Sequence, residues 1–340
     1  MKVILSSNKN PYIETFTEYI HKAFEENFCE TKFFENRNFI IPGRIRDRIH
    51  ALHLFDLERM NRQLIKLCQS FKPDLFLEAG GWNILPETIV KLKTMGIITA
   101  LWTIDPPRIF QEIINVSPYY DFVFCQGTEA VEILIKYRKE HLYWMPFACD
   151  PDIHKPVSLS LREQEKYKSD ICFVGSGWTS LYPERHQYLE QLADFNLSIW
   201  GPGWFESKNQ KLSPYIKQGF TKPEEWIKIF SAAKIVFHSH FTDPEGEIPC
   251  YQASPRVYEV LACEALLLVD NQPDVLALFE DREHLVVFRS EQELQNLAKY
   301  YLENETERKQ IAKKGKEFVL KKHTFKHRVK EILTIIENNG

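Results

Sequence analysis

Short apolar runs alternate with longer stretches of helical periodicity along the chain. The runs are rich in β-branched and aromatic side chains and are bounded by turn formers, which is typical of buried strands. The predicted strands are Val3–Leu5, Leu75–Leu77, Ile97–Trp102, Phe122–Cys125, Asp170–Val174, Leu197–Trp200, Ile235–His238 and Leu266–Val269. The predicted helices are Ile13–Phe28, Pro86–Met95, Glu184–Leu192, Pro223–Ala232, Pro255–Cys263, Glu291–Glu303, Glu305–Val319 and Thr324–Asn338. This alternation indicates βαβ units and a mainly parallel sheet.

One segment interrupts the alternation. Pro146–Pro156 contains three prolines and no periodic pattern, and the charged stretch Arg162–Lys168 follows it, so we interpret the region as an interdomain linker. The 340 residues also exceed the roughly 250–300 at which a single core stops growing. We therefore predict two doubly wound, Rossmann-like α/β domains that face a central cleft, with ligands bound beyond the carboxyl ends of the strands.

Composition and charge narrow the functional classes. The net charge of −4 gives no basic stripe of the kind a general nucleic-acid binder carries. The seven cysteines are dispersed and form no C-x-x-C pair, which argues against a disulfide framework or a zinc knuckle and favours a reducing compartment. No stretch is long enough for a membrane span, and the N-terminal apolar run is too short for a signal peptide. We expect a soluble, cytoplasmic protein.

A glycine-containing turn, Gly175-Ser176-Gly177, follows the predicted strand Asp170–Val174 and precedes a helix. Glycines let the backbone approach a ligand, and a helix N-terminus favours a phosphate. Arg185 lies in the first turn of that helix, where its guanidinium could hold a diphosphate by paired hydrogen bonds. The turn is neither a P-loop nor the dinucleotide fingerprint. The alternatives are an ordinary strand-to-helix turn and a solvated arginine.

A second motif begins a later helix. Ser254 is the expected cap and Pro255 suits the first turn. Arg256 and Glu259 are three residues apart, so they share a face near the helix start. In a functional interpretation Glu259 accepts both ribose hydroxyls of a nucleotide and Arg256 faces its phosphates. The alternative is a surface ion pair.

Two histidines lie at the end of the predicted strand Ile235–His238: His238 is its last residue, and His240 lies in the loop that follows. A metal site would need further ligands, which Asp243, Glu245 and Glu247 could supply. We favour a polar loop that lines the cleft, with His238 as a donor-site candidate, and predict no metal.

Two stretches in the first half also follow predicted strands. Gly80, Gly81 and Trp82 come after Leu75–Leu77, and Asp105 comes after Ile97–Trp102 and before two prolines. An α/β domain places its chemistry at such strand ends. Asp105 is a candidate catalytic base or anchor for an acceptor hydroxyl, and the alternative is a turn residue that bonds to its own backbone. The absence of Ser-His-Asp, Walker and His-Glu-x-x-His patterns weakens hydrolase, kinase and metalloprotease readings.

At these motifs the sequence resembles the CgeB-like (spore maturation) glycosyltransferases, a branch of the retaining GT-B enzymes. The matching pieces are Trp102–Pro106, Asp121–Cys125, Pro146–Pro156, Asp170–Gly177, Arg185, Ser254–Cys263, Leu266–Asp270 and His323–Arg328. The resemblance implies a GT-B fold with an acceptor-side domain over residues 1–152, a nucleotide-sugar domain over 153–322, and a last helix, 323–340, that packs back on the first domain. The sequence departs from the group at three positions. Glu264 stands where the group usually has Gly, and His238 stands where it often has Asn. Tyr251 stands where wider retaining families often have Glu.

The same resemblance implies roles for the motif residues. Gly175 and Ser176, with Gly177 beside them, approach the donor diphosphate, Arg185 neutralises it, Glu259 holds the ribose, and Arg256, Ser254 and His238 line the site. The expected reaction transfers a sugar from a nucleotide sugar, with UDP as the nucleotide by family frequency, to a protein, polysaccharide or small molecule, with retention and without metal or cofactor. Arg185 and Asp105 are the catalytic candidates. The competing readings are a non-catalytic GT-B nucleotide-sugar-binding protein and a nucleotide-sugar epimerase or hydrolase.

Overall fold

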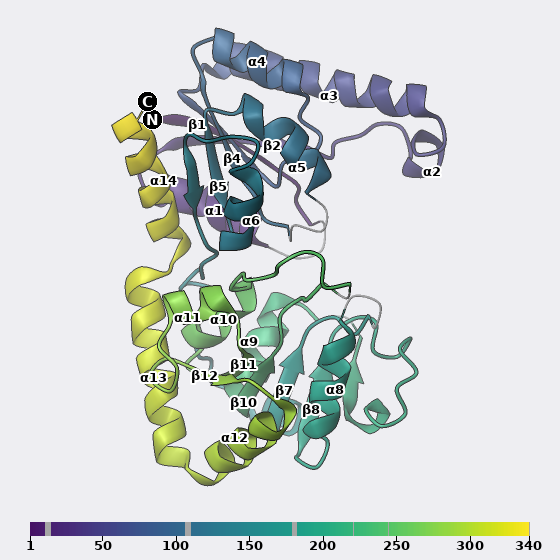
Figure 1. Cartoon of the computed structure of the whole chain (residues 1–340), viewed down its shortest axis with the longest axis vertical. Coiled ribbons are helices and arrows are strands. Elements are labelled where there is room, and N and C mark those ends of the chain that lie inside the picture. Colours follow the sequence, from purple (N-terminus) through teal and green to yellow (C-terminus); the bar gives the residue numbers. More distant parts are fainter. Residues whose placement is uncertain (11–14, 106–109, 179–181, 220, 244, 340) are drawn as a thin grey trace. The chain divides into compact units, whose positions relative to one another are not determined.

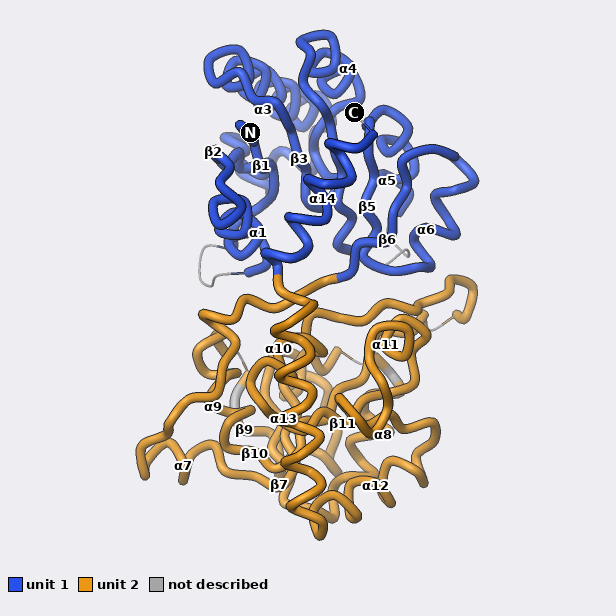
Figure 2. The backbone as a smooth tube through the Cα atoms, turned by 90° about the vertical axis from the view of Figure 1, so that its left-hand side faces the viewer, with its two compact units in different colours: residues 1–146, 325–340 blue, residues 147–324 orange. Residues whose placement is uncertain are grey.

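The computed structural model describes residues 1–10, 15–105, 110–178, 182–219, 221–243 and 245–339. The chain forms two compact units, which Figure 2 shows in blue and orange. Unit 1 comprises Met1–Pro146 and Phe325–Gly340, and unit 2 comprises Phe147–Thr324. The division after Pro146 assigns almost all of the proline-containing segment to unit 2, where we had expected a linker.

Unit 1 is built on a six-stranded parallel sheet in the order β2-β1-β3-β4-β5-β6. Its strands are β1 (Lys2–Ser7), β2 (Glu30–Glu35), β3 (Leu75–Ala79), β4 (Ile98–Trp102), β5 (Phe122–Cys125) and β6 (Leu142–Trp144). Its α-helices are α1 (Phe16–Glu26), α2 (Gly43–Arg46), α3 (His50–Phe71), α4 (Pro86–Thr94), α5 (Gln111–Val116), α6 (Thr128–Leu134) and α14 (Phe325–Asn339). The side chains of β3 and β5 are all buried, which is why these strands are nearly continuous apolar runs in the sequence.

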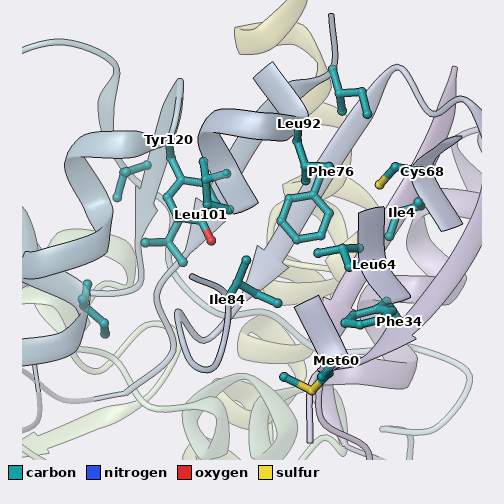
Figure 3. Close-up of a cluster of buried hydrophobic side chains, with 14 of the residues drawn as sticks. Ile4, Phe34, Met60, Leu64, Cys68, Phe76, Ile84, Leu92, Leu101 and Tyr120 are labelled. Carbon is teal, nitrogen blue, oxygen red and sulfur yellow. The ribbon is translucent and has the colours of Figure 1, made fainter. Parts of the chain in front are cut away.

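The core of unit 1 lies where helices pack on this sheet. Figure 3 shows Met60, Leu64 and Cys68 of α3 beside Ile4 and Phe76 of the sheet. On another part of the unit α14 lies beside α1 (Figure 1). Its Phe325 ring centroid is 5.7 Å from that of Tyr19 and 6.4 Å from that of Trp102. A helix made late in the chain therefore contributes to the core of the first unit.

Unit 2 repeats the architecture with a parallel sheet in the order β12-β11-β10-β7-β8-β9. Its strands are β7 (Ser169–Val174), β8 (Leu197–Trp200), β9 (Ile216–Gln218), β10 (Ala233–His238), β11 (Leu266–Asp270) and β12 (Val286–Phe288). Its α-helices are α7 (Leu161–Tyr167), α8 (Pro183–Gln191), α9 (Pro223–Ala232), α10 (Pro255–Ala262), α11 (Pro273–Leu278), α12 (Glu291–Glu303) and α13 (Glu305–Lys322). The stretch Arg162–Lys168, which we had included in a linker, forms α7 because Ser160 and Glu163 close a capping box at its start.

The strand order of each sheet reverses beside its first strand. In unit 1 the reversal lies between β1 and β3, and in unit 2 it lies between β7 and β10. Connections leave the two strands on either side of such a point in opposite directions, which opens a crevice at their carboxyl ends. The candidate residues of each unit come from the loops that follow these strands.

Candidate functional site

Arg185 of α8 spans the point in unit 2 where the strand order reverses. Its Nη1 donates to the carbonyl oxygen of Ser176, after β7, at 2.8 Å. Its Nε and Nη2 donate to the hydroxyl and carbonyl oxygens of Ser239, after β10, at 3.2 and 2.6 Å. Three of its five N–H groups are thus bound to neutral acceptors on both sides of the crevice. Arg185 is therefore held across the crevice, and it is not the solvated arginine that the sequence left open as an alternative.

The guanidinium of Arg185 is a buried charge. The residue is 5% exposed, and the ring of Tyr182 covers the guanidinium at 3.6 Å. Burial lowers the pKa of Arg185 to about 10, which still leaves it charged at neutral pH. No carboxylate within the described part of the chain forms an ion pair with it. Because a buried charge without a counter-ion is costly, this position suits an anionic ligand.

The glycines of the turn after β7 are needed for local packing. The Gly175 N–H donates to the carbonyl oxygen of Trp200, the last residue of β8, and the Gly177 N–H donates to that of Pro202, in the turn that follows. A Cβ on Gly177 would come within 2.4 Å of the Trp204 ring, and one on Gly201 within 2.1 Å of the Gly175 carbonyl oxygen. The backbones of the two turns therefore approach closely. These contacts fit the ordinary-turn alternative for Gly175 and Gly177.

Two buried polar atoms near Arg185 have no hydrogen-bond partner within the described residues. One is the hydroxyl oxygen of Ser176 and the other is Nδ1 of His238. Burial, followed by the neighbouring His240 and the charges of Arg185 and Arg256, holds the pKa of His238 well below its usual value. His238 is therefore neutral. Unsatisfied buried polar atoms are rare in folded proteins and mark where a ligand can bind.

The two histidines at the end of β10 are engaged with different groups. Nε2 of His238 is 2.7 Å from the Ser254 hydroxyl, and Nε2 of His240 accepts the Ser254 N–H at 3.1 Å. Nδ1 of His240 is 2.8 Å from the Asp270 carboxylate, so this ring nitrogen carries a proton. Burial opposes ionisation of Asp270, but its contacts with His240 and Gln272 outweigh burial and lower its pKa. We had expected Ser254 to cap α10, but its hydroxyl bonds to His238 and makes no capping hydrogen bond.

Arg256 and Glu259 form a buried pair on α10. The Arg256 Nη1 donates to Glu259 Oε2 at 2.7 Å, and the two side chains are 14% and 11% exposed. The Arg256 guanidinium also lies over the Trp226 ring of α9, at 4.5 Å from its centroid. The second oxygen of Glu259 is 3.8 Å from Nε2 of His154. The pair is therefore not the surface ion pair that the sequence left open.

His154, Ser239 and Trp226 contribute to the site and were not identified from the sequence. His154 belongs to the proline-containing segment, where nothing but its residue type marked it. Ser239 lies between His238 and His240, which were considered as site residues, but no sequence feature marked Ser239 itself. The sequence signal for Trp226 is its place on α9, and only the fold brings it to Arg256.

In unit 1 the residues expected on the acceptor side come together in part. Trp82 Nε1 donates to Asp105 Oδ2 at 2.8 Å, which joins the loops after β3 and β4. Burial raises the pKa of Asp105, and the Trp82 hydrogen bond and the Arg37 charge oppose the rise. Gly80 and Gly81 have φ angles of 123° and 89°, so both need glycine. The two prolines after Asp105 lie outside the described residues.

A buried carboxyl lies directly before this loop. Glu78, in β3, is fully buried and bonds to the Tyr120 hydroxyl. Burial raises the pKa of Glu78 to about 8, although Tyr120, the Trp82 backbone and Asn36 oppose the rise. Its side chain is therefore mostly protonated at neutral pH. The sequence placed Glu78 beside the glycines but gave no sign of its burial.

A pocket of about 750 Å³ opens beside this loop in unit 1. It is formed by the loop after β2, by α2 and α3, by the loop after β3 and by α5. Gly81 and Trp82 line it, whereas Gly80 and Asp105 do not. Its size is within the range of small-molecule sites, roughly 300–1,000 Å³.

Two further properties concern metals and membranes. Within the described residues no group of three or more histidine, cysteine or acidic side chains is arranged to hold a metal ion. His238 and His240 instead bond to Ser254 and Asp270. Among the helices of the described ranges, none is both long and apolar enough to cross a membrane.

Comparison with protein families gives a match in the second half of the chain. Residues 184–334 match the family model described as glycosyl transferase-like. The matched range begins one residue before Arg185 and includes Arg256 and Glu259. No curated protein sequence matches the chain significantly.

Solved structures match over nearly the whole chain. Sucrose-phosphate synthase from Thermosynechococcus elongatus has a TM-score of 0.71 at 12% identity, covering 99% of this chain and 98% of that one. Anabaena HepE in complex with UDP-glucose has a TM-score of 0.70 at 12% identity, covering 99% and 100%. A trehalose-6-phosphate synthase studied for glycosyl transfer with retention has a TM-score of 0.67 at 11% identity, covering 98% and 99%.

These structures share the GT-B architecture, in which each domain is Rossmann-like, as both units are here. At such low identity they establish the fold. The family model adds the class of activity. Residues 184–334 therefore match a glycosyl transferase-like family, and the chain as a whole has the GT-B fold.

Proposed function

We propose that unit 2 binds a nucleoside diphosphate sugar, with UDP as the nucleotide, and that the enzyme transfers the sugar with retention in the manner of the CgeB-like branch. The observation that carries this proposal is Arg185, a buried cation that spans the crevice and has no carboxylate partner in the described residues. HepE, which has the same fold, is solved with UDP-glucose, and this supports UDP as the nucleotide.

In this proposal two guanidinium groups neutralise the diphosphate. Arg256 is close enough to Arg185 for its charge to contribute to the lowered pKa of Arg185. The two like charges repel each other, so an anion that binds between them relieves the repulsion. Glu259 then exchanges part of its contact with Arg256 for the ribose hydroxyls. Negative charge grows on the leaving diphosphate in the transition state, and fixed cations stabilise it most strongly there.

The remaining site residues have supporting roles in the proposal. The Ser176 hydroxyl and Nδ1 of His238, both buried and without a partner among the described residues, provide polar contacts to the donor. The turn with Gly175 and Gly177 brings its backbone close to the donor diphosphate. Ser254 orients the His238 ring through their hydrogen bond. In unit 1 Gly80, Gly81, Trp82 and Asp105 form the acceptor side. We propose turnover without a metal or cofactor and a cytoplasmic location.

The test is calorimetric titration of the protein with UDP, GDP, dTDP and their sugar conjugates. We expect UDP and one UDP-sugar to bind, and Arg185→Ala to weaken binding about 10- to 150-fold, which corresponds to the roughly 1.5–3 kcal/mol of a charged hydrogen bond. Glu259→Gln keeps the size of the side chain and should weaken UDP, but not inorganic diphosphate, which has no ribose. Arg289→Ala removes an exposed ion pair of unit 2 and serves as the control. Absence of binding to every nucleotide, or equal binding by Arg185→Ala and Arg289→Ala, would overturn the donor site.

Release of UDP separates transfer from the alternatives. Transfer predicts that UDP release depends on an added acceptor. Rapid release without any acceptor would favour a hydrolase or an epimerase that frees its nucleotide. Binding without release under any condition would favour a non-catalytic nucleotide-sugar-binding protein.

A further inference from the structure

The pocket of unit 1 lies at the carboxyl end of the sheet, beside the reversal of strand order. It is enclosed by segments that follow three strands: the loop after β2, the loop after β3, and α5 after β4. Trp82 lines it, and the same ring donates to Asp105 at 2.8 Å. The pocket and the candidate acceptor carboxylate are thus joined by one rigid side chain.

The charge of the pocket is positive, although the whole chain is negative. Among the described residues that line it, Arg37 and Arg46 are basic and Glu112 alone is acidic. The guanidinium of Arg37 has no hydrogen bond or ion pair with any described residue, and its charge acts on Asp105. Arg46 donates to the exposed Asp47 at 3.0 Å and stacks on the Phe39 ring at 3.9 Å. One arginine is therefore available to an anion, and the second is already oriented by an aromatic ring.

The walls also offer surfaces for a ring. Phe39 and Trp82 present aromatic side chains, and Asn83 and Asn115 add amide groups. Asn83 is itself fixed, because its side chain donates to the Asn36 carbonyl oxygen at 3.0 Å. Aromatic faces pack on the apolar face of a sugar ring, and polar groups in fixed places select its orientation.

We infer that this pocket binds the acceptor, and that the acceptor is a small ring-shaped molecule with a phosphate or carboxylate group. The inference rests on the proposed glycosyl transfer. The anionic group binds Arg37 and Arg46, the ring packs on Phe39 and Trp82, and the reacting hydroxyl is directed to Asp105. In the transfer, the acceptor oxygen bonds to the anomeric carbon, the bond from that carbon to the diphosphate breaks with its electron pair on UDP, and the hydroxyl proton passes to the departing diphosphate.

Direct binding tests the inference without the donor. Calorimetric titration compares glucose, glucose 6-phosphate and glucuronate with the wild-type protein, Arg37→Ala and Arg62→Ala. Arg62 is on the exposed side of α3, paired with Glu58, and is the matched control. We expect at least one charged sugar to bind ten-fold or more tightly than glucose, Arg37→Ala to remove that preference, and added salt to weaken it. The phosphate and carboxylate sugars distinguish the two anionic groups.

Turnover provides the second readout. With the UDP-sugar that binds unit 2, the charged sugar should accelerate UDP release, and Arg37→Ala should raise its KM about ten-fold while donor affinity stays unchanged. Equal binding of neutral and charged sugars, or equal behaviour of Arg37→Ala and Arg62→Ala, would overturn the acceptor class. Failure of UDP-sugar binding would instead overturn the proposed donor site, and the direct titration would still decide the acceptor class.

Discussion

Arg185 is a buried cation that donates hydrogen bonds to Ser176, in the loop after β7, and to Ser239, in the loop after β10. Its place in the first turn of a helix could be predicted from the sequence, because Pro183 starts the helix and a glycine-containing strand end precedes it. Its burial could not, because Ser239 is 54 residues away and only the fold brings it close. The glycines illustrate the opposite case. The position of Gly177 suggested a ligand, and in the structure the nearby Trp204 ring accounts for the lack of a side chain there.

Glu78 leads to a prediction about stability and pH. Its pKa of about 8 in the folded protein exceeds the ordinary value of 4.5. Between these values the folded state retains a proton that the unfolded state has released, so stability falls as pH rises and loses nothing further above about 8. Glu78→Gln does not titrate. Its free energy of unfolding relative to wild type should therefore increase by about 1.4 kcal/mol for each pH unit across this window.

Urea unfolding at pH 5.5, 6.5 and 7.5 measures this difference. Glu58→Gln, an exposed change on α3, is the control and should show no such trend. A constant difference between Glu78→Gln and wild type over the three pH values would mean that Glu78 is ionised in the folded protein.

At the level of elements, the buried strands were predictable and the edge strands were not. Phe122–Cys125 and Leu197–Trp200 occur with their predicted bounds, because strands buried on both faces are continuous apolar runs. β2 was missed because half of its residues are charged (two glutamates and a lysine), and all but one are at least partly exposed at the sheet edge. β9, also at an edge, contains Lys217 and Gln218 among its three residues.

The longest helix was also missed. α3 spans His50–Phe71, yet buries only seven side chains and leaves Leu54 and Phe55 exposed near its start. Apolar residues on both faces weaken the helical period in the sequence. Because α3 lines the unit 1 pocket with His53 and Leu57, this omission also hid the pocket.

A glycine within α13 gives a prediction for this helix. A Cβ on Gly315 would lie 2.3 Å from the His284 carbonyl oxygen and 2.9 Å from Leu261 Cδ2. Alanine gains about 1 kcal/mol of helix propensity over glycine, but overpacking costs about 1–3 kcal/mol. Because backbone cannot move as easily as a side chain, we expect Gly315→Ala to destabilise unit 2 by up to about 2 kcal/mol in chemical unfolding.

Lys313→Ala is the matched change, because it adds alanine to the same helix at a side chain that is 68% exposed. It should alter stability by less than about 0.5 kcal/mol. A Gly315→Ala protein as stable as Lys313→Ala, or more stable, would show that the contact between α13 and the loop before β12 can relax.

For the whole molecule, the alternation of strands and helices predicted two Rossmann-like units, and the comparisons confirm the fold. The division of the chain was harder to predict. A proline-containing stretch suggested a linker over 146–156, but a break in periodicity does not show to which core its residues belong. Cys149 pairs with Thr324 in an isolated parallel bridge, so the segments that enter and leave unit 2 are joined.

Removal of residues 325–340 tests the dependence of unit 1 on α14. The deletion removes the buried side chains of Phe325, Val329, Ile332 and Ile336, each worth about 1.5–3 kcal/mol when buried. We expect the unfolding temperature of unit 1 to fall strongly in calorimetry, or its transition to disappear. The transition of unit 2, which UDP stabilises, should remain. Lys330→Ala, on the exposed face of α14, should leave both transitions in place. An intact unit 1 transition after the deletion would show that its core is complete without α14.

The position of α14 also has a consequence for synthesis on the ribosome. Unit 2 is complete once Thr324 has been made, whereas the first 146 residues still lack a helix of their core. At about 5–20 residues per second, the 178 residues of unit 2 take roughly 10–35 s to translate. The nascent first unit therefore exposes the side chains that α14 will cover for that whole time, and chaperones that recognise apolar surface have the longest access to this part of the protein.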